Sequence, residues 1–213
     1  MAAPETPRTP AAAAVAAAVV ILLWAGYTAL QTLFVTGHIG EPRSALLGFV
    51  PGALGLGALM AAGLRRRECF LTLAPLSRRG FWVLAGLFVF ALAATLPFGV
   101  WQGWSWRTAL LYAPAAGVSQ ELFFRSALLP AMGMIMRKRA GAGLILHAAL
   151  FGLWHIGPLF AGAPAWAVAA VMLVPFLSGV GWGWQVRRDG TVVWAMAQHT
   201  LIWASVMQFA FSG

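Results

Sequence analysis

Two ionisable residues, Glu121 and Arg125, lie inside a long apolar stretch of the sequence. They are four residues apart, so on a helix they share one face and can form an ion pair. At membrane depth each charge costs roughly 2.5–3.5 kcal/mol on insertion scales, and charged residues found there usually face the interior of a bundle and have a function. An ion pair that only orients the helix is the simpler structural alternative.

Three histidines follow in later apolar stretches: His147, His155 and His199. A carboxylate beside an imidazole can hold and deprotonate a water molecule. A second imidazole can donate a hydrogen bond to a developing oxyanion, and Arg125 can fix the carboxylate. The residue types therefore predict a hydrolytic centre made of Glu121, His155, His199 and Arg125.

The distance along each helix from the nearest basic cluster predicts the depth of these side chains. Glu121 precedes Arg137 by sixteen residues and His155 follows Arg139 by sixteen, so both lie about 24 Å from those charges at about 1.5 Å per residue. His199 follows its own basic cluster by eleven residues, or about 16 Å. We expect Glu121 and His155 to meet at one level, and His199 to need a helix tilt to join them.

Other functions of the same residues stay open. Histidine and glutamate are ordinary zinc ligands, but no His-Glu-x-x-His motif and no Cys/His cluster occurs, so we expect no metal and no cofactor. Buried charges also serve as proton relays in small transporters, although no repeat symmetry is evident. His147 is shallower than His155 and about 80° around the same helix, which indicates an ordinary core residue.

Membrane-spanning helices are the elements that must position these residues. Hydrophobic residues make up 61% of the 213-residue chain and charged residues 9%, whereas a soluble domain carries about 25% charged residues. The apolar runs are continuous, which indicates helices, because lipid offers no partners for backbone polar groups. We predict an all-α, polytopic transmembrane bundle, in which a polar tail (residues 1–10) precedes a single transmembrane domain (residues 11–213). About seven spans are expected, at 11–36, 44–64, 80–100, 108–136, 141–157, 163–186 and 191–211.

The basic residues predict the orientation of the bundle. With seven spans, eleven of the fourteen cations fall on one side, only Arg43 and Arg107 fall on the other, and Arg125 lies within a span. Positive loops stay cytoplasmic, so the N-terminus is expected inside and the C-terminus outside. The first apolar run is longer than the 7–15-residue core of a signal peptide and is interpreted as a retained span. Short basic clusters between apolar runs do not form a basic groove, so no nucleic-acid partner is expected.

Small residues predict where helices approach one another closely. Gly179 and Gly183 form a Gly-x-x-x-Gly motif in the sixth span, which is typical of helix packing in membranes. Gly52, Gly55 and Gly57 in the second span resemble a phosphate-binding loop only in composition. No strand precedes them and no Lys-Ser/Thr follows, so close packing or a kink at Pro51 is the better interpretation.

Three motifs in order resemble those of the CAAX protease and bacteriocin-processing family, also called the Abi family. They are Gln120-Glu121-x-x-x-Arg125, Phe151-x-x-x-His155, and His199 in the last span. The family pattern is Glu-Glu-x-x-x-Arg, Phe-x-x-x-His and His-x-x-x-Asn/Asp, and the match covers about residues 107–210. The chain departs from the pattern at the first Glu, which is Gln120, and at the final Asn/Asp, which is Trp203.

The resemblance implies an intramembrane glutamic endopeptidase with a helical bundle fold. It implies that His155 takes part in water activation, that His199 stabilises an oxyanion and that Arg125 is an electrostatic partner, with Glu121 as the remaining carboxylate. The substrate would be a membrane-anchored or lipid-modified protein or peptide, such as a bacteriocin-like peptide that is matured or a C-terminal sorting signal that is trimmed. The high Arg-to-Lys ratio and the alanine richness of the sequence indicate a bacterial genome, so we expect a bacterial inner membrane. Gln120 cannot act as a base, so a non-catalytic scaffold or binding member of the family is the alternative.

Overall fold

The computed structural model describes residues 9–40, 46–102, 105–136 and 139–210. Helices dominate these residues, and they contain no strand. In chain order the helical elements are α1 (Pro10–Val35), α3 (Phe49–Ala61), α4 (Arg78–Gln102), η1 (Thr108–Tyr112), α5 (Ala113–Glu121), η2 (Leu122–Leu128), α6 (Leu129–Met136), α7 (Ala140–Leu153), η3 (Trp154–Ile156), α8 (Gly157–Phe160), α9 (Ala165–Asp189) and α10 (Val193–Ala210).

The predicted all-α fold is confirmed, with one helical segment for each of the seven apolar runs. Three helices of the described residues are long and apolar enough to cross a membrane, at Pro10–Val35, Gly141–Phe160 and Ala165–Asp189. The chain is thus an integral membrane protein. Among the cations used to predict orientation, Arg8, Arg43, Arg137 and Lys138 lie outside the described residues.

The second apolar run forms a shorter helix than its length suggests. It was predicted as a 21-residue span at 44–64, but α3 has 13 residues and extends about 20 Å, which is less than the roughly 30 Å of a bilayer core. The helix ends at Ala61, and Gly63 adopts a positive φ of 88° two residues later. Glycine tolerates this left-handed conformation, so the chain can turn there.

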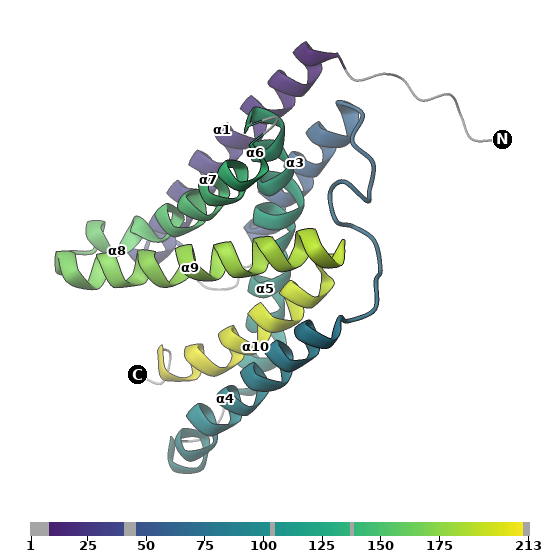
Figure 1. Cartoon of the computed structure of the whole chain (residues 1–213). Coiled ribbons are helices and arrows are strands. Elements are labelled where there is room, and N and C mark those ends of the chain that lie inside the picture. Colours follow the sequence, from purple (N-terminus) through teal and green to yellow (C-terminus); the bar gives the residue numbers. More distant parts are fainter. Residues whose placement is uncertain (1–8, 41–45, 103–104, 137–138, 211–213) are drawn as a thin grey trace.

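The segment from η1 to α6 runs through the middle of the molecule as one rod (Figure 1). Helices α1, α3 and α7 surround its later half, α10 packs along its earlier half, and α4 packs on α10. Helix α9 crosses between these two groups and packs on α7. Glu121 and Arg125 lie near the middle of this rod, where the helices around its earlier half and those around its later half meet.

Close packing at small residues explains two of these helix contacts. A Cβ atom at Gly179 would lie 3.1 Å from Ala148 Cα, and one at Gly183 would lie 2.6 Å from Leu144 Cδ1. The predicted Gly-x-x-x-Gly contact is therefore confirmed, between α9 and α7. A Cβ atom at Gly52 would likewise lie 3.3 Å from Leu122 Cβ, which confirms packing as the role of that glycine.

The remaining two glycines of α3 differ from each other. A Cβ atom at Gly55 would lie 3.0 Å from Ala127 Cβ, whereas one at Gly57 would meet nothing within 4 Å. The packing interpretation is therefore confirmed for Gly55 and wrong for Gly57, because the two residues lie on different faces of the helix.

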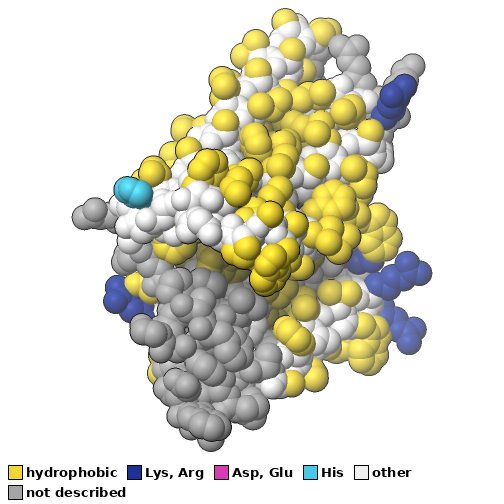
Figure 2. All heavy atoms as spheres, turned by 90° about the vertical axis from the view of Figure 1, so that its left-hand side faces the viewer, with side chains coloured by type: hydrophobic (Ala, Val, Ile, Leu, Met, Phe, Trp, Pro, Cys, Tyr) yellow, Lys and Arg dark blue, Asp and Glu magenta, His cyan; other side chains and the backbone are white. Residues whose placement is uncertain are grey.

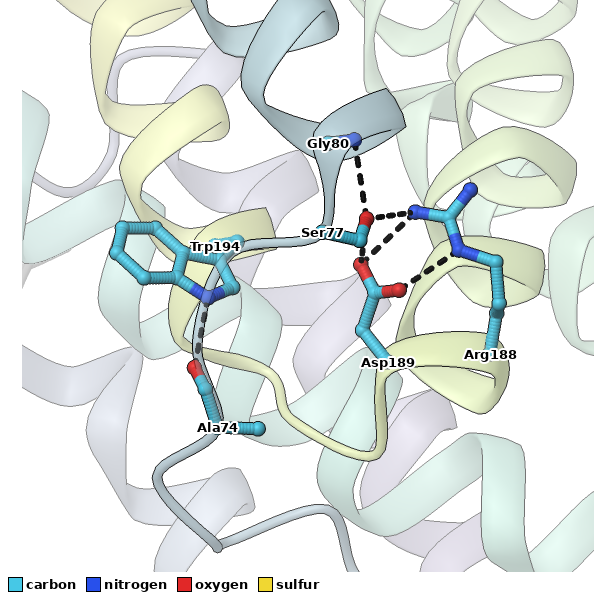
Figure 3. A network of polar contacts seen from close by, with 6 residues as sticks. All are labelled: Ala74, Ser77, Gly80, Arg188, Asp189 and Trp194. Atoms are coloured by element: carbon cyan, nitrogen blue, oxygen red, sulfur yellow. Dashed lines mark hydrogen bonds and ion pairs between the residues drawn. The ribbon is translucent and has the colours of Figure 1, made fainter.

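Polar contacts tie the loop before α4 to the turn between α9 and α10 (Figure 3). Arg188 binds Asp189 through Nε (2.7 Å) and Nη2 (2.9 Å), and its Nη2 also donates to Ser77 Oγ (2.8 Å). Ser77 Oγ accepts from Gly80 N (3.1 Å), as an N-cap residue does, and donates to Asp189 (3.3 Å). The indole of Trp194 donates to the Ala74 carbonyl (3.0 Å). These contacts fix the start of α4 against the start of α10.

The surface of the bundle is widely apolar (Figure 2). Hydrophobic side chains cover much of the described part of this face, and Lys and Arg side chains lie near its margins. Large apolar residues such as Trp166 (76% exposed) and Leu22 (72%) would be unfavourable in water. In a bilayer they face lipid, which agrees with the membrane assignment.

Candidate functional site

Glu121 and Arg125 form the expected ion pair in the centre of the protein. Arg125 Nε lies 3.1 Å from Glu121 Oε2, and both side chains have an exposed fraction of 0%. The contact is an ion pair without aligned hydrogen-bond geometry, and Nη1 and Nη2 have no hydrogen-bond partner among the described residues. The pair spans the junction of α5 with η2, whose wider π-helical turns often occur at functional sites.

Aromatic rings surround the Arg125 guanidinium. Its Cζ lies 4.3 Å from the centroid of Phe151 and 5.4 Å from that of Trp182. Both distances are within the roughly 6 Å range of cation–π attraction, which is strongest for desolvated cations. The phenylalanine of the second motif therefore helps to hold the arginine of the first.

His199 contacts Glu121 directly, through Nδ1 and Oε1 at 2.8 Å. Helix α10 can approach α5 this closely because of Gly117, one turn before Glu121. A Cβ atom at Gly117 would lie 2.5 Å from Thr200 Oγ1 and 2.8 Å from Thr200 N. The count along each helix placed His199 at a different depth from Glu121 and required a tilt or a short offset to join them, and the close crossing of α10 with α5 brings the two side chains into contact.

Both nitrogens of the His199 ring are engaged. Trp203 Nε1 donates to His199 Nε2 at 3.0 Å. An indole N–H is only a donor, so Nε2 accepts and Nδ1 carries the proton that faces Glu121. His199 therefore has no N–H left to offer an oxyanion, which is the role that the family resemblance implied.

His155 lies at a break in its helix. The residue has φ −88° and ψ 18°, which is outside helical geometry, and it falls in the short η3 turn between α7 and α8. Pro158 causes the break, since proline lacks the N–H that would bond the carbonyl of Trp154 and its ring clashes with that carbonyl. The predicted span at 141–157 continues past this break to Phe160.

The His155 ring keeps one nitrogen free. Nδ1 lies 3.0 Å from the Phe151 carbonyl and donates to it, which leaves Nε2 as an acceptor. The ring stands edge-on to Trp154, with centroids 4.7 Å apart, and the residue is half-buried. Within the described residues, His155 and Glu121 share no hydrogen bond or ion pair.

Gln120 points to a cavity between α1, the central rod and α10. Its side chain lines this cavity together with Tyr27, Ser119, Trp154 and Trp203. Glu121 lines none of it and is turned toward Arg125 and His199 instead. Adjacent helical residues point about 100° apart, which is why these two neighbours have such different surroundings.

His147 is fully buried, and neither ring nitrogen has a hydrogen-bond partner among the described residues. Its ring packs against α9, where a Cβ atom at Gly183 would lie 3.3 Å from Cε1. These contacts agree with a core position. The described residues contain no group of three His, Cys, Asp or Glu side chains that could hold a metal ion.

Two aromatic contacts of the site were not predicted from the sequence. Trp182 packs on both Arg125 and the His199 ring, the latter with centroids 4.7 Å apart. Trp203 lies one turn after His199, and this i,i+4 spacing could have indicated its hydrogen bond. For Trp182, which comes from α9, no local spacing signals the contact.

The comparisons with known proteins agree with the motifs. The family model for Type II CAAX prenyl endopeptidase Rce1-like proteins matches residues 101–204, which include all three motifs. No curated protein matches the chain, and no solved structure matches it. On the motifs, the helical fold and this match, residues 101–204 belong to the Rce1-like CAAX prenyl endopeptidase family.

Proposed function

We propose that this chain is an intramembrane endopeptidase that cleaves a membrane-anchored or lipid-modified protein or peptide, with His155 as the base that activates water. The family is one of proteases, which supports a peptidase. We place the enzyme in a bacterial inner membrane, with residues 11–213 as one transmembrane domain. A cytoplasmic N-terminus follows from the basic loops.

The free nitrogen of His155 is the observation that carries this proposal. Gln120 cannot take a proton, Glu121 has both oxygens engaged and is fully buried, and His199 has both nitrogens engaged. His155 alone among the motif residues combines a free acceptor with partial exposure. The hydrogen bond from Nδ1 to the Phe151 carbonyl fixes the tautomer that a base needs.

The proposed reaction is direct hydrolysis. His155 Nε2 takes a proton from water while the water oxygen attacks the carbonyl carbon of the scissile peptide bond. The carbon–nitrogen bond then breaks, and the proton passes to the leaving amine. Glu121, Arg125 and His199 act as positioning residues, because together they hold the central rod to α10.

Cleavage of defined peptides in proteoliposomes tests the proposal. A farnesylated peptide ending in a CAAX sequence and a myristoylated peptide without one supply two kinds of lipid anchor. We expect His155→Ala to lower the cleavage rate by about 10²–10⁴-fold, the usual contribution of a general base. His38→Ala removes an exposed histidine in the turn after α1 and is the control. An unchanged rate in His155→Ala would refute the assigned base.

A non-catalytic binding protein is the second candidate, and the contact between Trp203 and His199 favours it. The indole occupies the nitrogen that the family resemblance assigns to the oxyanion, and Gln120 replaces the family's first glutamate. A protein with these two changes could hold a lipid-modified peptide without cleaving it. If the wild type shows no cleavage and Gln120→Glu/Trp203→Asn does, this second function is the correct one.

A further inference from the structure

Gln120 carries a buried polar atom without a partner at the edge of a cavity. Its side chain is 4% exposed, and Oε1 makes no hydrogen bond within the described residues. An unsatisfied buried amide costs roughly 1–3 kcal/mol on scales from protein mutants. Both Glu121 oxygens face a charged or hydrogen-bonding group of the protein, Arg125 or His199, whereas the Gln120 oxygen faces none among the described residues and is available to a ligand.

The lining of the cavity is polar in places but carries no charge. The polar residues Tyr27, Gln31, Tyr112, Ser119 and Gln120 share it with aromatic and aliphatic residues. A charged ligand buried here would have no counter-ion among the lining residues, at a large cost in free energy. A neutral ligand with both a donor and an acceptor fits this lining.

The size of the cavity narrows the ligand further. Its volume is about 40 Å³, which exceeds the roughly 10–15 Å³ that one buried water needs, so the cavity admits a group larger than a single water molecule. A peptide group has three non-hydrogen atoms: carbon, oxygen and nitrogen. The cavity is not sealed, because Gln31, Tyr112 and Trp203 at its edge are only half-buried, and an extended chain can continue from it.

We propose that this cavity is a subsite for one backbone peptide group of the substrate, in which the Gln120 carboxamide exchanges hydrogen bonds with that group. The inference rests on the proposed function and names the part of the substrate that this cavity receives. A carboxamide carries one acceptor and two donors, so Oε1 can accept from the N–H of a peptide group while Nε2 donates to a carbonyl.

The neutral side chain suits this role better than the carboxylate of the family pattern. An ionised glutamate is acceptor-only, and at this depth it would need a counter-charge that the lining does not contain. Glutamine binds the peptide group without one. Where the family pattern has a glutamate, Gln120 would therefore bind the backbone of the substrate.

Binding to a depsipeptide tests the subsite without requiring cleavage. The probe is a myristoylated alanine-rich hexapeptide, together with a set in which one backbone amide at a time is replaced by an ester, which removes one N–H. Affinities are measured for the full chain in lipid nanodiscs. We expect one ester position to weaken binding about fivefold, as for a single hydrogen bond of about 1 kcal/mol.

Two variants assign that effect to a residue. In Gln120→Leu the sensitive ester and its amide parent should bind equally well, whereas Gln185→Leu, a buried glutamine outside the cavity, should keep the fivefold preference. Gln120→Glu retains the acceptor and the shape, so it keeps the preference even if the leucine variant does not fold. Persistence of the preference in folded Gln120→Leu, or the lack of any sensitive ester, would overturn the subsite.

The proposed subsite and the proposed endopeptidase activity can each be refuted without refuting the other. Amide-selective binding without hydrolysis of any probe would support the subsite and refute the endopeptidase. Hydrolysis in a protein whose binding shows no ester sensitivity would do the reverse.

Discussion

Two arginine–carboxylate contacts of this protein have similar chemistry and different surroundings. At the end of α9, Arg188 and Asp189 pair at 2.7 Å, with the arginine side chain 25% exposed and the aspartate side chain 4% exposed. In the central rod, Arg125 and Glu121 pair at 3.1 Å with neither side chain exposed. In both cases a third residue completes the network, Ser77 in the first and His199 in the second.

The two ion pairs differ in the free energy that is lost when one partner is removed. Water and ions can replace a partner at the surface, so exposed pairs contribute about 0–1 kcal/mol. No water replaces a partner at Glu121, and the remaining buried charge would cost about 3–5 kcal/mol. The shorter contact is therefore the weaker one for stability, and distance alone does not rank them.

The largest expected effect comes from breaking the buried pair. Arg125→Met should lower the free energy of unfolding by about 3–5 kcal/mol, because it leaves Glu121 charged and unpaired. Reversible unfolding in mixed micelles measures this change. Glu121→Gln/Arg125→Met removes both charges and should recover most of the loss. Arg79→Met, at an exposed arginine, is the control, and an equal loss in the double variant would contradict the assignment to charge.

Disruption of the close crossing of α5 and α10 should have the second-largest effect on the free energy of unfolding. Gly117→Ala places a Cβ atom against Thr200 and should cost about 1–3 kcal/mol, as overpacking does. Gly57→Ala is the matched control, since nothing lies within 4 Å of that position and alanine is favoured over glycine within a helix. If both variants lowered the unfolding free energy equally, the crossing would not explain the contact of Glu121 with His199.

Trp203→Phe should have a smaller effect on stability and a clear spectroscopic one. The variant keeps the ring but removes the N–H, at about 0.5–1.5 kcal/mol for one hydrogen bond. The imidazole ¹⁵N resonance of His199 Nε2 should shift, because that nitrogen loses its donor. Trp166→Phe, at a residue 76% exposed, should leave the resonance in place. An unshifted resonance in Trp203→Phe would disprove the tautomer assigned here.

The surface pair should give the smallest effect. Arg188→Gln should change the unfolding free energy by at most about 1 kcal/mol, and the change should shrink further in high salt. A titration with sodium chloride in the same unfolding experiment measures this. A loss as large as that of Arg125→Met, and insensitive to salt, would remove the contrast between the two networks.

Local patterns predicted the elements and the first half of the site. The ion pair of Glu121 with Arg125 follows from i,i+4 spacing, and the seven helical segments follow from the apolar runs. His199 was expected in the same centre as Glu121, but their direct contact could not be predicted, because it depends on where two helices cross. Gly117, which permits that crossing, is one of 24 glycines in the sequence, and only the structure distinguishes it from Gly57.

The break at His155 is a second feature that depth along a helix could not predict. The count of about 24 Å assumed a continuous helix, whereas α7 ends at Leu153, two residues before His155. The direction in which the His155 ring points is therefore set by the η3 turn and not by the rotation of about 100° per residue in a continuous helix. Pro158 is present in the sequence, and the known effect of proline within a helix indicates a break near His155.

The local ion pair has a consequence for the order in which this protein is made. Spans enter the membrane from the N-terminal side as synthesis proceeds, and His199 is 78 residues beyond Glu121. The central rod must therefore enter the bilayer before its distant partner exists. Arg125 is in the same helix and available at once, so the two charges neutralise each other during insertion. His199 then contacts a Glu121 carboxylate that entered the bilayer already paired with Arg125.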